Sequence, residues 1–400
     1  MILGSRIEKK LAELQSRGEL PLAVELWNGH RYAPAGRSSV VLRVSRDASL
    51  RRLAHPDLAT LGEAYVEGDV DLEGPIDEAF RAAEALARLW SNDSRRRLPR
   101  LATHSRKIDS EAIQYHYDVS NDFYRLWLDQ RMVYSCAYFK TGDEGIDSAQ
   151  EQKLDHICRK LQLQPGERFL DIGCGWGALV LHAAQKYGVD ATGITLSVNQ
   201  RAFAVERIRA MGLQDRCRVL LQDYRDAPGA GAFDKVASIG MFEHVGLKNL
   251  PQYFGAIGRL LADGGIAMND GITSANTSNR EVDLGVGAFV DKYVFPDGEL
   301  PHLSLVVKEM SAAGLEVMDV ETLRLHYART LRQWSRRLEA NLGAARAYAG
   351  DKRTRIWRLY LAGCAHAFER HWVTIHQVLA VKSSSPARNP LPWTRDYMYR

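Results

Sequence analysis

Short apolar runs alternate with longer segments of helical periodicity from about residue 147 to residue 268. The apolar runs cover residues 168–172, 190–194, 219–221, 233–239 and 265–268. Helical patterns separate them at residues 178–187, from Val198 onward and at residues 254–261. Regular alternation of strands and helices predicts a parallel sheet with crossover helices. The expected fold class is therefore α/β, a doubly wound sheet whose ligand lies beyond the carboxyl ends of the strands.

The flanking segments carry different patterns. Residues 6–14 and 77–89 have helical periodicity, and residues 40–44 form one alternating apolar run. From Leu331 onward the chain reads as helical, with aromatic and leucine residues at intervals that suit packed amphipathic helices. The last residues, rich in Ser and Pro, resemble a poorly ordered linker. These patterns predict an N-terminal, mostly helical domain at 1–108, a catalytic domain at 109–382 and a tail at 383–400.

Composition excludes several classes of protein. The 400 residues are 46% hydrophobic and 26% charged, with 32 Gly and 13 Pro, which excludes disordered and collagen-like chains. No stretch approaches the ~20 apolar residues of a membrane-spanning helix, and the first residues do not form a secretory signal. Five scattered cysteines without a C-x-x-C pair exclude a disulfide framework and a zinc ribbon. A cytoplasmic location is the simplest expectation.

The net charge of +4, from 53 basic and 49 acidic residues, does not indicate a nucleic-acid-binding protein. Positive charge is concentrated between Arg95 and Lys107, close to the expected domain boundary. Two interpretations stay open for this stretch. It is a solvated linker, or it is a patch that faces phosphate groups of a lipid surface.

A glycine-rich turn follows the first strand of the predicted sheet. It reads Asp171-Ile172-Gly173-Cys174-Gly175-Trp176-Gly177. Glycines allow a sharp turn from strand to helix and leave room for a ligand against the backbone. The spacing differs from the dinucleotide fingerprint, and the Gly-Lys-Ser/Thr of a P-loop is absent. The pattern resembles the first motif of class I S-adenosylmethionine (SAM) methyltransferases.

Polar residues at the next two strand ends fit the same cofactor. Thr195, Leu196 and Ser197 follow the second strand, with Gln200 one helical turn later. The third strand is followed by Gln222, Asp223 and Tyr224, and the Asp carboxylate can accept from the adenine amine while the Tyr packs the ring. Each residue alone is also compatible with an ordinary loop. In this order, they favour a SAM site.

The fourth strand ends in Ile239-Gly240-Met241-Phe242-Glu243-His244. In the common fold this strand end faces the transferable methyl group, and an apolar wall with one carboxylate is suited to chemistry there. A buried carboxylate can orient a base or take a proton itself. His116, His244 and His326 lack the spacing of metal ligands, so no metal site is expected.

These motifs, with Tyr134-Ser135-Cys136-Ala137-Tyr138 and Lys292-Tyr293-Val294-Phe295-Pro296, resemble those of the cyclopropane-fatty-acyl-phospholipid synthases and the related mycolic acid cyclopropane synthases. The resemblance runs from about Tyr115 to Cys364, and Leu61-Gly62-Glu63-Ala64-Tyr65 resembles the N-terminal lipid-binding domain of the phospholipid enzymes. It implies SAM-dependent methylene transfer to the cis double bond of a phospholipid acyl chain. It also implies a bound bicarbonate base held by Cys136, Glu243, Ile272 and Tyr327. The implied cofactor residues are Tyr134, Ser135, Asp171, Gly173, Gly175, Gly177, Thr195, Leu196, Ser197, Gln200, Gln222, Asp223, Tyr224, Ile239 and Gly240.

One position departs from the family. Where the family has the His that contacts bicarbonate, this chain has Asp270. A carboxylate beside Glu243 would repel an anion, which puts bicarbonate in doubt. Two hypotheses follow: Asp270 is itself the proton acceptor, or the reaction ends in a methyl- or methylene-branched chain.

Other functions stay open at this point. They are methylation of a soluble small molecule and a lipid-binding protein that has lost catalysis. The expected partner is an unsaturated phospholipid, with no nucleic acid and no metal. By resemblance the protein is a homodimer that acts from the cytoplasm, transiently, at the inner membrane surface.

Overall fold

The computed structural model describes residues 2–46, 49, 57–90, 120–227, 229–278, 285–295, 298–383 and 389–399. The chain divides into two compact units. The first contains residues 1–101, 282–296 and 334–367. The second contains residues 102–281, 297–333 and 368–400. The expected catalytic domain of residues 109–382 is thus not continuous in this division, because two of its segments pack with the N-terminal residues. The basic stretch Arg95–Lys107 lies outside the described residues.

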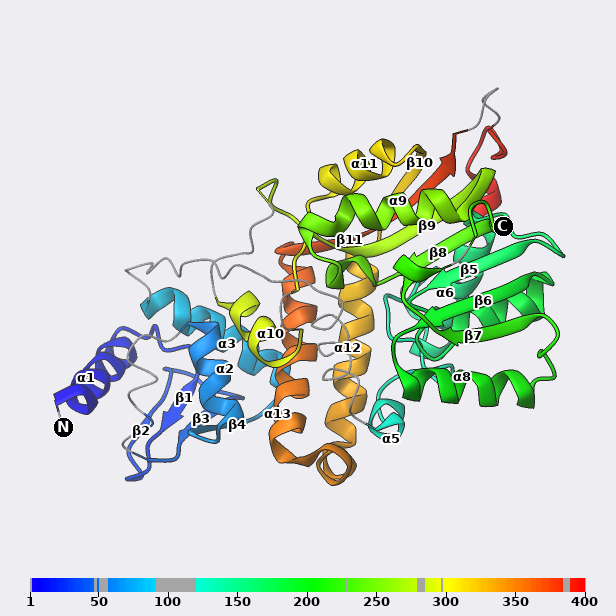
Figure 1. Ribbon diagram of the computed structural model, residues 1–400. Helices are drawn as coiled ribbons and strands as arrows, with labels where there is room; N and C mark the ends of the chain where they lie inside the picture. The colour runs from blue at the N-terminus through cyan, green and yellow to red at the C-terminus, as the bar shows by residue number, and fades with distance from the viewer. Residues whose placement is uncertain are drawn as a thin grey trace. The chain divides into compact units, whose positions relative to one another are not determined.

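A seven-stranded sheet forms the centre of the second unit (Figure 1). Its order is β10-β11-β9-β8-β5-β6-β7. Strands β5 to β9 pair in parallel, and β11 runs antiparallel to both of its neighbours. The strands are β5 Arg168–Ile172, β6 Asp190–Thr195, β7 Cys217–Leu221, β8 Phe233–Ile239, β9 Leu261–Ser274, β10 Leu315–Thr322 and β11 Val373–Lys382.

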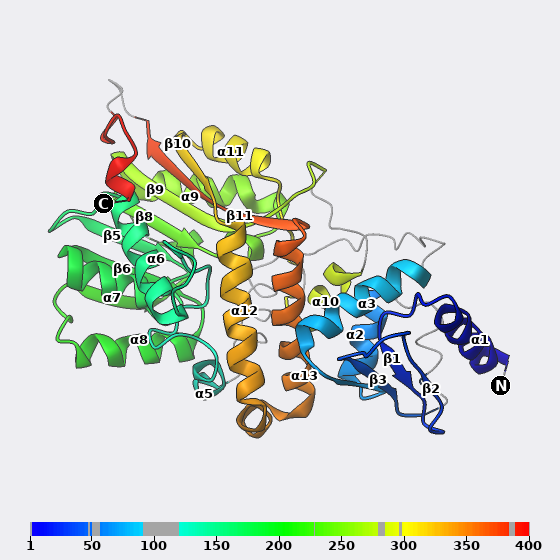
Figure 2. The same cartoon turned by 180° about the vertical axis from the view of Figure 1, so that it is seen from behind.

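Helices cover both faces of this sheet (Figures 1 and 2). One buried cluster joins the sheet to α6 (Ile146–Lys160), α7 (Ala178–His182) and α8 (Val198–Ala210). A second cluster joins the opposite face to α9 (Leu250–Leu260) and α11 (Leu303–Ala312). Neighbouring strand residues divide between the two clusters, as Phe169 and Leu170 do, because successive side chains point to opposite faces. This arrangement confirms the predicted doubly wound α/β fold.

The five predicted strands and the helices between them are confirmed, but the remainder of the prediction is partly wrong. The segment after Leu331 is not helical throughout: α12 (Arg324–Ala340) and α13 (Leu342–Glu369) are followed by β11. Nearly all of β11 is buried, so it shows no alternation of apolar and polar residues that would distinguish it from a buried helix.

The tail prediction is also wrong for the residues that the structure describes. A short 3-10 helix, η6, spans Asp396–Met398. The Met398 side chain is buried, and its carbonyl oxygen lies 3.0 Å from Nδ1 of His156. The C-terminal residues therefore pack onto the second unit.

The first unit combines helices with a small sheet. Its helices are α1 (Ile2–Ser16), α2 (Leu58–Val66), α3 (Ile76–Trp90) and α10 (Val286–Tyr293), together with most of α13. The sheet has the order β2-β1-β3-β4. Its strands are β1 Ala23–Glu25, β2 Arg31–Tyr32, β3 Val41–Val44 and β4 Val70–Glu73, of which only β3 was anticipated. Among the described residues, no helix has the length and apolar character needed to cross a membrane.

Candidate active site

A cavity of about 740 Å³, partly open to solvent, lies at the carboxyl ends of four parallel strands. Ile172 at the end of β5, Thr195 at the end of β6, Gln222 after β7 and Gly240 after β8 all line it. Nine of the predicted cofactor residues belong to its lining: Gly173, Gly175, Thr195, Leu196, Gln200, Gln222, Asp223, Tyr224 and Gly240. The lining also includes Ile194, Arg225, Met241, His244 and Val245, which sequence analysis did not assign to the cofactor.

Two residues at the end of β5 have features that suit a polar ligand. Gly173 has a φ of +80°, and a Cβ there would meet the Met241 Cγ at 3.1 Å, so only glycine suits this turn. Asp171 is buried, and its Oδ1 atom has no hydrogen-bond partner among the described residues. Burial raises the pKa of Asp171 to about 7. A positively charged ligand group near Asp171 would satisfy this carboxylate.

Hydrogen bonds between neighbouring side chains hold the residues at the ends of β6 and β7 in place. The Thr195 hydroxyl donates to Oε1 of Gln200 at 2.9 Å. Arg225 donates to both oxygens of Asp223, at 2.9 and 2.6 Å, and its guanidinium lies 5.4 Å from the centre of the Tyr224 ring. The Asp223 carboxylate is therefore held in a fixed orientation at the cavity wall. Arg225 belongs to the motif that follows the third strand, but sequence analysis gave it no role, because a lone Arg after a strand is ordinary in a loop.

The other six predicted cofactor residues are not in the cavity lining. Gly177 and Ser197 are the N-caps of α7 and α8, and Ile239 ends β8. Asp171 lies beneath the glycine turn. Tyr134 packs with Tyr124 and Trp127, and Ser135 accepts a hydrogen bond from Lys153. Their roles toward a cofactor stay predictions.

Two buried carboxylates, those of Asp270 and Glu243, lie beside the cavity. The main-chain N–H of Gly240, which lines the cavity, donates to the carbonyl of Asp270 at 2.8 Å. Glu243 lies in a 3-10 turn, η4 (Phe242–His244), and its Oε1 accepts from the main-chain N–H of Ile272 at 2.6 Å. Oδ1 of Asp270 and Oε2 of Glu243 are buried, and no described residue supplies either with a hydrogen bond. Two buried carboxylate oxygens that accept no hydrogen bond from the described residues are suited to proton transfer.

Burial raises the pKa values of both groups. For Glu243 the pKa rises to about 7, opposed by the Ile272 N–H and raised further by the charge of Asp270. For Asp270 the pKa rises to about 6, opposed by a hydrogen bond from Gln377 and by the charges of Lys153 and Lys160. Both carboxyls therefore titrate close to neutral pH, as general acids and bases commonly do.

Cys136 and Tyr327 come together through Leu323. The Cys136 thiol points to the Leu323 carbonyl at 3.8 Å, and the same carbonyl accepts from the Tyr327 N–H at 3.0 Å. Burial raises the pKa of the Cys136 thiol well above its usual value, so the thiol stays protonated and is no nucleophile. The charge of Asp270 raises this pKa as well, which places Cys136 within its electrostatic reach.

Helix α6 holds the loop that carries Cys136. Gln150 donates to the Ser135 carbonyl at 2.9 Å, and the Lys153 ammonium donates to the Ser135 hydroxyl at 2.8 Å. Lys153 is buried, and the charges of Asp270, Asp129 and Asp171 oppose the effect of burial on its pKa, which is lowered. Sequence analysis missed Lys153. Its spacing from His156 and Lys160, three and seven residues later, is also that of a solvated helix face, so the sequence offered no signal for its burial.

Of the histidines considered for a metal site, His326 has a structural contact, His244 lines the cofactor cavity, and His116 lies outside the described residues. Nδ1 of His326 accepts from the main-chain N–H of Phe139 at 3.0 Å. Within the described part of the chain, no group of three His, Cys, Asp or Glu side chains is arranged to hold a metal ion.

Comparison with protein families places this site in context. The family described as mycolic acid cyclopropane synthetase matches residues 104–378. A domain of unknown function matches residues 11–94.

Individual relatives agree with this match. A probable fatty acid methyltransferase of Pseudomonas putida is 49% identical, over 95% of this chain and 97% of that protein. The cyclopropane-fatty-acyl-phospholipid synthase of Escherichia coli K12 is 33% identical, over 90% of this chain and 92% of that protein. Among solved structures, the mycolic acid cyclopropane synthase CmaA1 complexed with SAH and CTAB has a TM-score of 0.65 at 35% identity, over 70% of this chain and 99% of that one.

Proposed function

Because this chain belongs to the mycolic acid cyclopropane synthetase family and is a SAM-dependent methyltransferase, we propose that it alkylates the cis double bond of an unsaturated phospholipid acyl chain. The new carbon closes to a cyclopropane, and Asp270 accepts the proton that is lost. The observation that carries this proposal is the buried Asp270 Oδ1, which no described residue satisfies, beside the Glu243 carboxylate and the cofactor cavity.

The cavity residues fit SAM, which supplies an electrophilic methyl group on a sulfonium centre when bound. The turn at Gly173 leaves room for the cofactor, and the Asp171 carboxylate can interact with its positively charged amino group. Asp223, oriented by Arg225, can accept from the adenine amine while Tyr224 packs against the ring. Met241 lines the cavity and its neighbour Phe242 is buried, and these nonpolar side chains would limit the access of water to the methyl group.

Asp270 and Glu243 divide the proton chemistry. Addition of a methyl group to the double bond leaves a positive charge on the acyl chain. Two carboxylates beside that charge stabilise it. Oδ1 of Asp270 then takes a proton from the new methyl carbon: the C–H bond breaks, an O–H bond forms, and the C–H electron pair closes the ring. Glu243, fixed by Ile272, remains as the second negative group.

Bicarbonate does not fit these residues. Ile272 was expected to contact the anion, but its main-chain N–H already donates to Glu243. Two carboxylates with free oxygens would repel a further negative charge. Bicarbonate therefore has no part in the proposed reaction.

Asp270 is also compatible with a second product. A carboxylate at position 270 can remove a proton from a neighbouring chain carbon instead, which would leave a methyl- or methylene-branched chain. The relative at 49% identity carries the name of a fatty acid methyltransferase, in line with this outcome.

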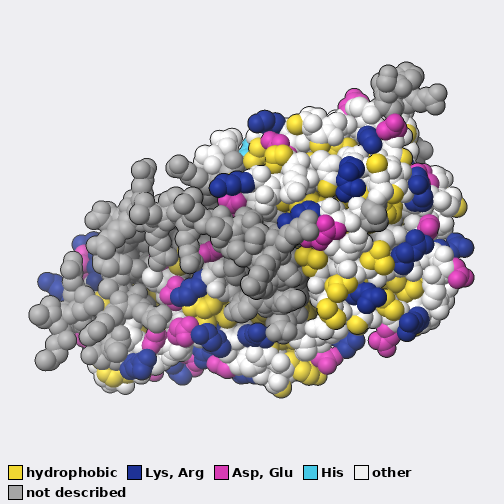
Figure 3. All heavy atoms as spheres, viewed as in Figure 1, with side chains coloured by type: hydrophobic (Ala, Val, Ile, Leu, Met, Phe, Trp, Pro, Cys, Tyr) yellow, Lys and Arg dark blue, Asp and Glu magenta, His cyan; other side chains and the backbone are white. Residues whose placement is uncertain are grey.

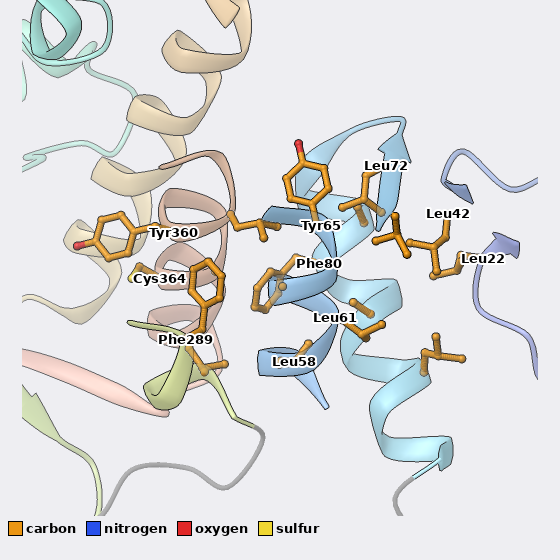
Figure 4. Close-up of a pocket in the computed structure, with 18 of the residues that line it drawn as sticks. Leu22, Leu42, Leu58, Leu61, Tyr65, Leu72, Phe80, Phe289, Tyr360 and Cys364 are labelled. Atoms are coloured by element: carbon orange, nitrogen blue, oxygen red, sulfur yellow. The ribbon is translucent and has the colours of Figure 1, made fainter. Parts of the chain in front are cut away.

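The first unit contains a feature that fits the predicted lipid-binding role of the N-terminal region. A cavity of about 750 Å³, partly open to solvent, is lined almost entirely by carbon atoms (Figure 4). Leu61 and Phe80 from α2 and α3 line it together with Phe289 from α10, and all its lining residues belong to the first unit. A cavity of this size and character suits an alkyl chain. We place the enzyme at the inner membrane surface as a homodimer, by family resemblance.

Incubation with SAM and phospholipid vesicles tests the function. A gain of one CH2 per acyl chain, seen by mass analysis of released fatty acids and absent with saturated vesicles, is the expected result. Proton NMR then distinguishes a cyclopropane ring from a branched chain. Methylation of a soluble small molecule, or no turnover with binding retained, would instead support one of the two competing functions.

A further inference from the structure

A row of polar side chains crosses three antiparallel strands next to the candidate reaction centre. Asp270 on β9 lies directly opposite Gln377 on β11, and Gln377 lies directly opposite Glu321 on β10. Residues directly opposite on neighbouring strands project from the same face of a sheet. These three side chains therefore form a continuous polar row on one face of the sheet.

Helix α6 covers this row with basic residues. His156 and Lys160, spaced four apart, lie on one face of the helix, and the side chains of both are fully buried. The Lys160 ammonium donates to Oε2 of Glu321 at 2.5 Å and to Oε1 of Gln377 at 3.0 Å. Nε2 of His156 lies 2.7 Å from the same Glu321 oxygen. Figures 1 and 2 show α6 alongside these strands.

The orientation of the Gln377 amide follows from its neighbours. Lys160 has only donors, so Gln377 must turn its oxygen toward the ammonium. Its NH2 group then faces Asp270 and donates to Oδ2 at 2.9 Å. In a protonated carboxyl the C=O oxygen is the stronger acceptor, so the N–H of Gln377 favours Oδ2 as the carbonyl oxygen. A proton on Asp270 is therefore favoured on Oδ1, to which no described residue donates a hydrogen bond.

We propose that Gln377 and Lys160 are positioning residues for the reaction: they hold Oδ2 of Asp270 so that Oδ1 alone receives the proton from the substrate. In this step a C–H bond of the alkylated chain breaks, an O–H bond forms at Oδ1, and the C–H electron pair goes to the new carbon–carbon bond. The inference rests on the proposed role of Asp270 as the base. Gln377 and Lys160 are fully buried, and neither belongs to the lining of the cofactor cavity.

The charges around Asp270 support this role. Lys153 and Lys160 face it from α6, Glu243 from the turn after β8, Glu321 from β10, and the Cys136 thiol from its loop. Burial alone would keep Asp270 protonated, and the hydrogen bond from Gln377 is the largest influence that opposes burial. Removal of this bond should therefore favour the protonated, inactive form of Asp270.

The test compares Gln377→Met and Lys160→Met with the wild-type protein. We expect the acidic limb of the kcat–pH profile to move up by about one pH unit in each variant, the size of a lost charge-assisted hydrogen bond, with the rate recovering at high pH. Lys235→Met removes another buried lysine of the same unit, paired with Glu167, and should leave the limb in place. In an Asp270→Asn background, Gln377→Met should have no further effect on the profile.

A second readout separates this inference from the proposed function. Infrared difference spectra between wild type and Asp270→Asn report the protonation of Asp270 without turnover. An upward shift of the Asp270 titration in Gln377→Met would uphold the contact by which Gln377 orients Asp270. If wild type at the same time formed no product that depends on Asp270, the assigned reaction would be overturned. An unshifted titration and an unshifted rate profile in folded variants would overturn the positioning role. If Gln377→Met does not fold, Gln377→Asn, which withdraws the amide by one methylene, tests the same contact.

Discussion

The main-chain N–H of Ile272 donates to Oε1 of Glu243 at 2.6 Å, joining the turn after β8 to the carboxyl-terminal part of β9. The bond fixes Oε1 of the buried Glu243 carboxylate. The other oxygen, Oε2, has no hydrogen-bond partner among the described residues. Asp270, two residues before Ile272, shows the same division between one bonded and one free oxygen. Strand β9 therefore supplies both Asp270, the proposed base, and the Ile272 N–H, which orients Glu243.

Glu243→Gln should abolish most of the activity while the protein stays folded. The Gln carbonyl can still accept from Ile272, but the negative charge that stabilises the cationic acyl chain is gone. We expect a fall in kcat of about 10²- to 10³-fold, typical of a lost electrostatic contact to a transition state. Turnover on unsaturated vesicles measures it, with the exposed Glu316→Gln as the control. Full activity of Glu243→Gln would show that this charge has no part in the reaction.

Asp270 should control the pH dependence. Its pKa is raised to about 6, so the carboxylate that acts as the base is present above this pH and is lost as the pH falls through it. In wild type, kcat should be level at alkaline pH, decline below about pH 7 as Glu243 is protonated, and decline more steeply below about pH 6 as Asp270 is protonated too. Asp270→Asn should lower kcat by about 10²- to 10⁴-fold and remove the steeper part of this decline, so that only the dependence on Glu243 is left. A product formed at an undiminished rate by Asp270→Ala would contradict the assignment.

The parts of this fold that were predictable are those with a local pattern. Strands β5, β6, β7 and β8 are short apolar runs between helices, and their order in the sequence implies where their carboxyl ends meet. The cofactor cavity could therefore be assembled from motifs such as Asp171 to Gly177. Strand β11 could not be predicted, because both of its faces are buried and its pairing partners lie about a hundred residues away in β9.

The buried charges were hidden for a different reason. Lys153 and Lys160 on α6 have the spacing of a solvated helix face, and nothing local indicates that this face is turned inward. The partners of Lys160, which are Gln377 and Glu321, come from strands that sequence analysis did not find. Asp270 was noticed only through its departure from a family motif. The contacts that orient it depend on the tertiary fold.

Gly271 should be sensitive to substitution. A Cβ at this position would lie 2.2 Å from the Phe242 ring, beside Glu243. Gly271→Ala should therefore destabilise the protein by about 1–3 kcal/mol, as overpacked cores do, and reduce activity by moving the turn. Gly255→Ala in the exposed face of α9, where a Cβ meets nothing within 4 Å, should be neutral or slightly stabilising. Denaturant unfolding compares the two. Equal stability would argue against close packing at Gly271.

Asp223 should act on cofactor affinity and not on the chemical step. Its carboxylate is held by two hydrogen bonds from Arg225 at the cavity wall. Asp223→Asn should weaken binding of SAM and SAH by about 10- to 100-fold, the size of one lost charge-assisted hydrogen bond, with kcat at saturating SAM nearly unchanged. Calorimetric titration with SAH measures the affinity, and the exposed Asp215→Asn provides the control. A changed kcat with unchanged affinity would remove Asp223 from the cofactor site.

A large side chain should block the apolar cavity of the first unit. Ala83 on α3 lines this cavity, whereas Arg81 on the same helix is exposed. We expect Ala83→Trp to weaken binding of a fluorescent fatty acid by at least about tenfold, a loss of about 1.4 kcal/mol, and Arg81→Trp to leave it unchanged. SAH binding should be the same in both variants, because the cofactor cavity belongs to the second unit. Undiminished probe binding in a folded Ala83→Trp variant would mean that the probe binds elsewhere, and the lipid-binding role of this cavity would then be wrong.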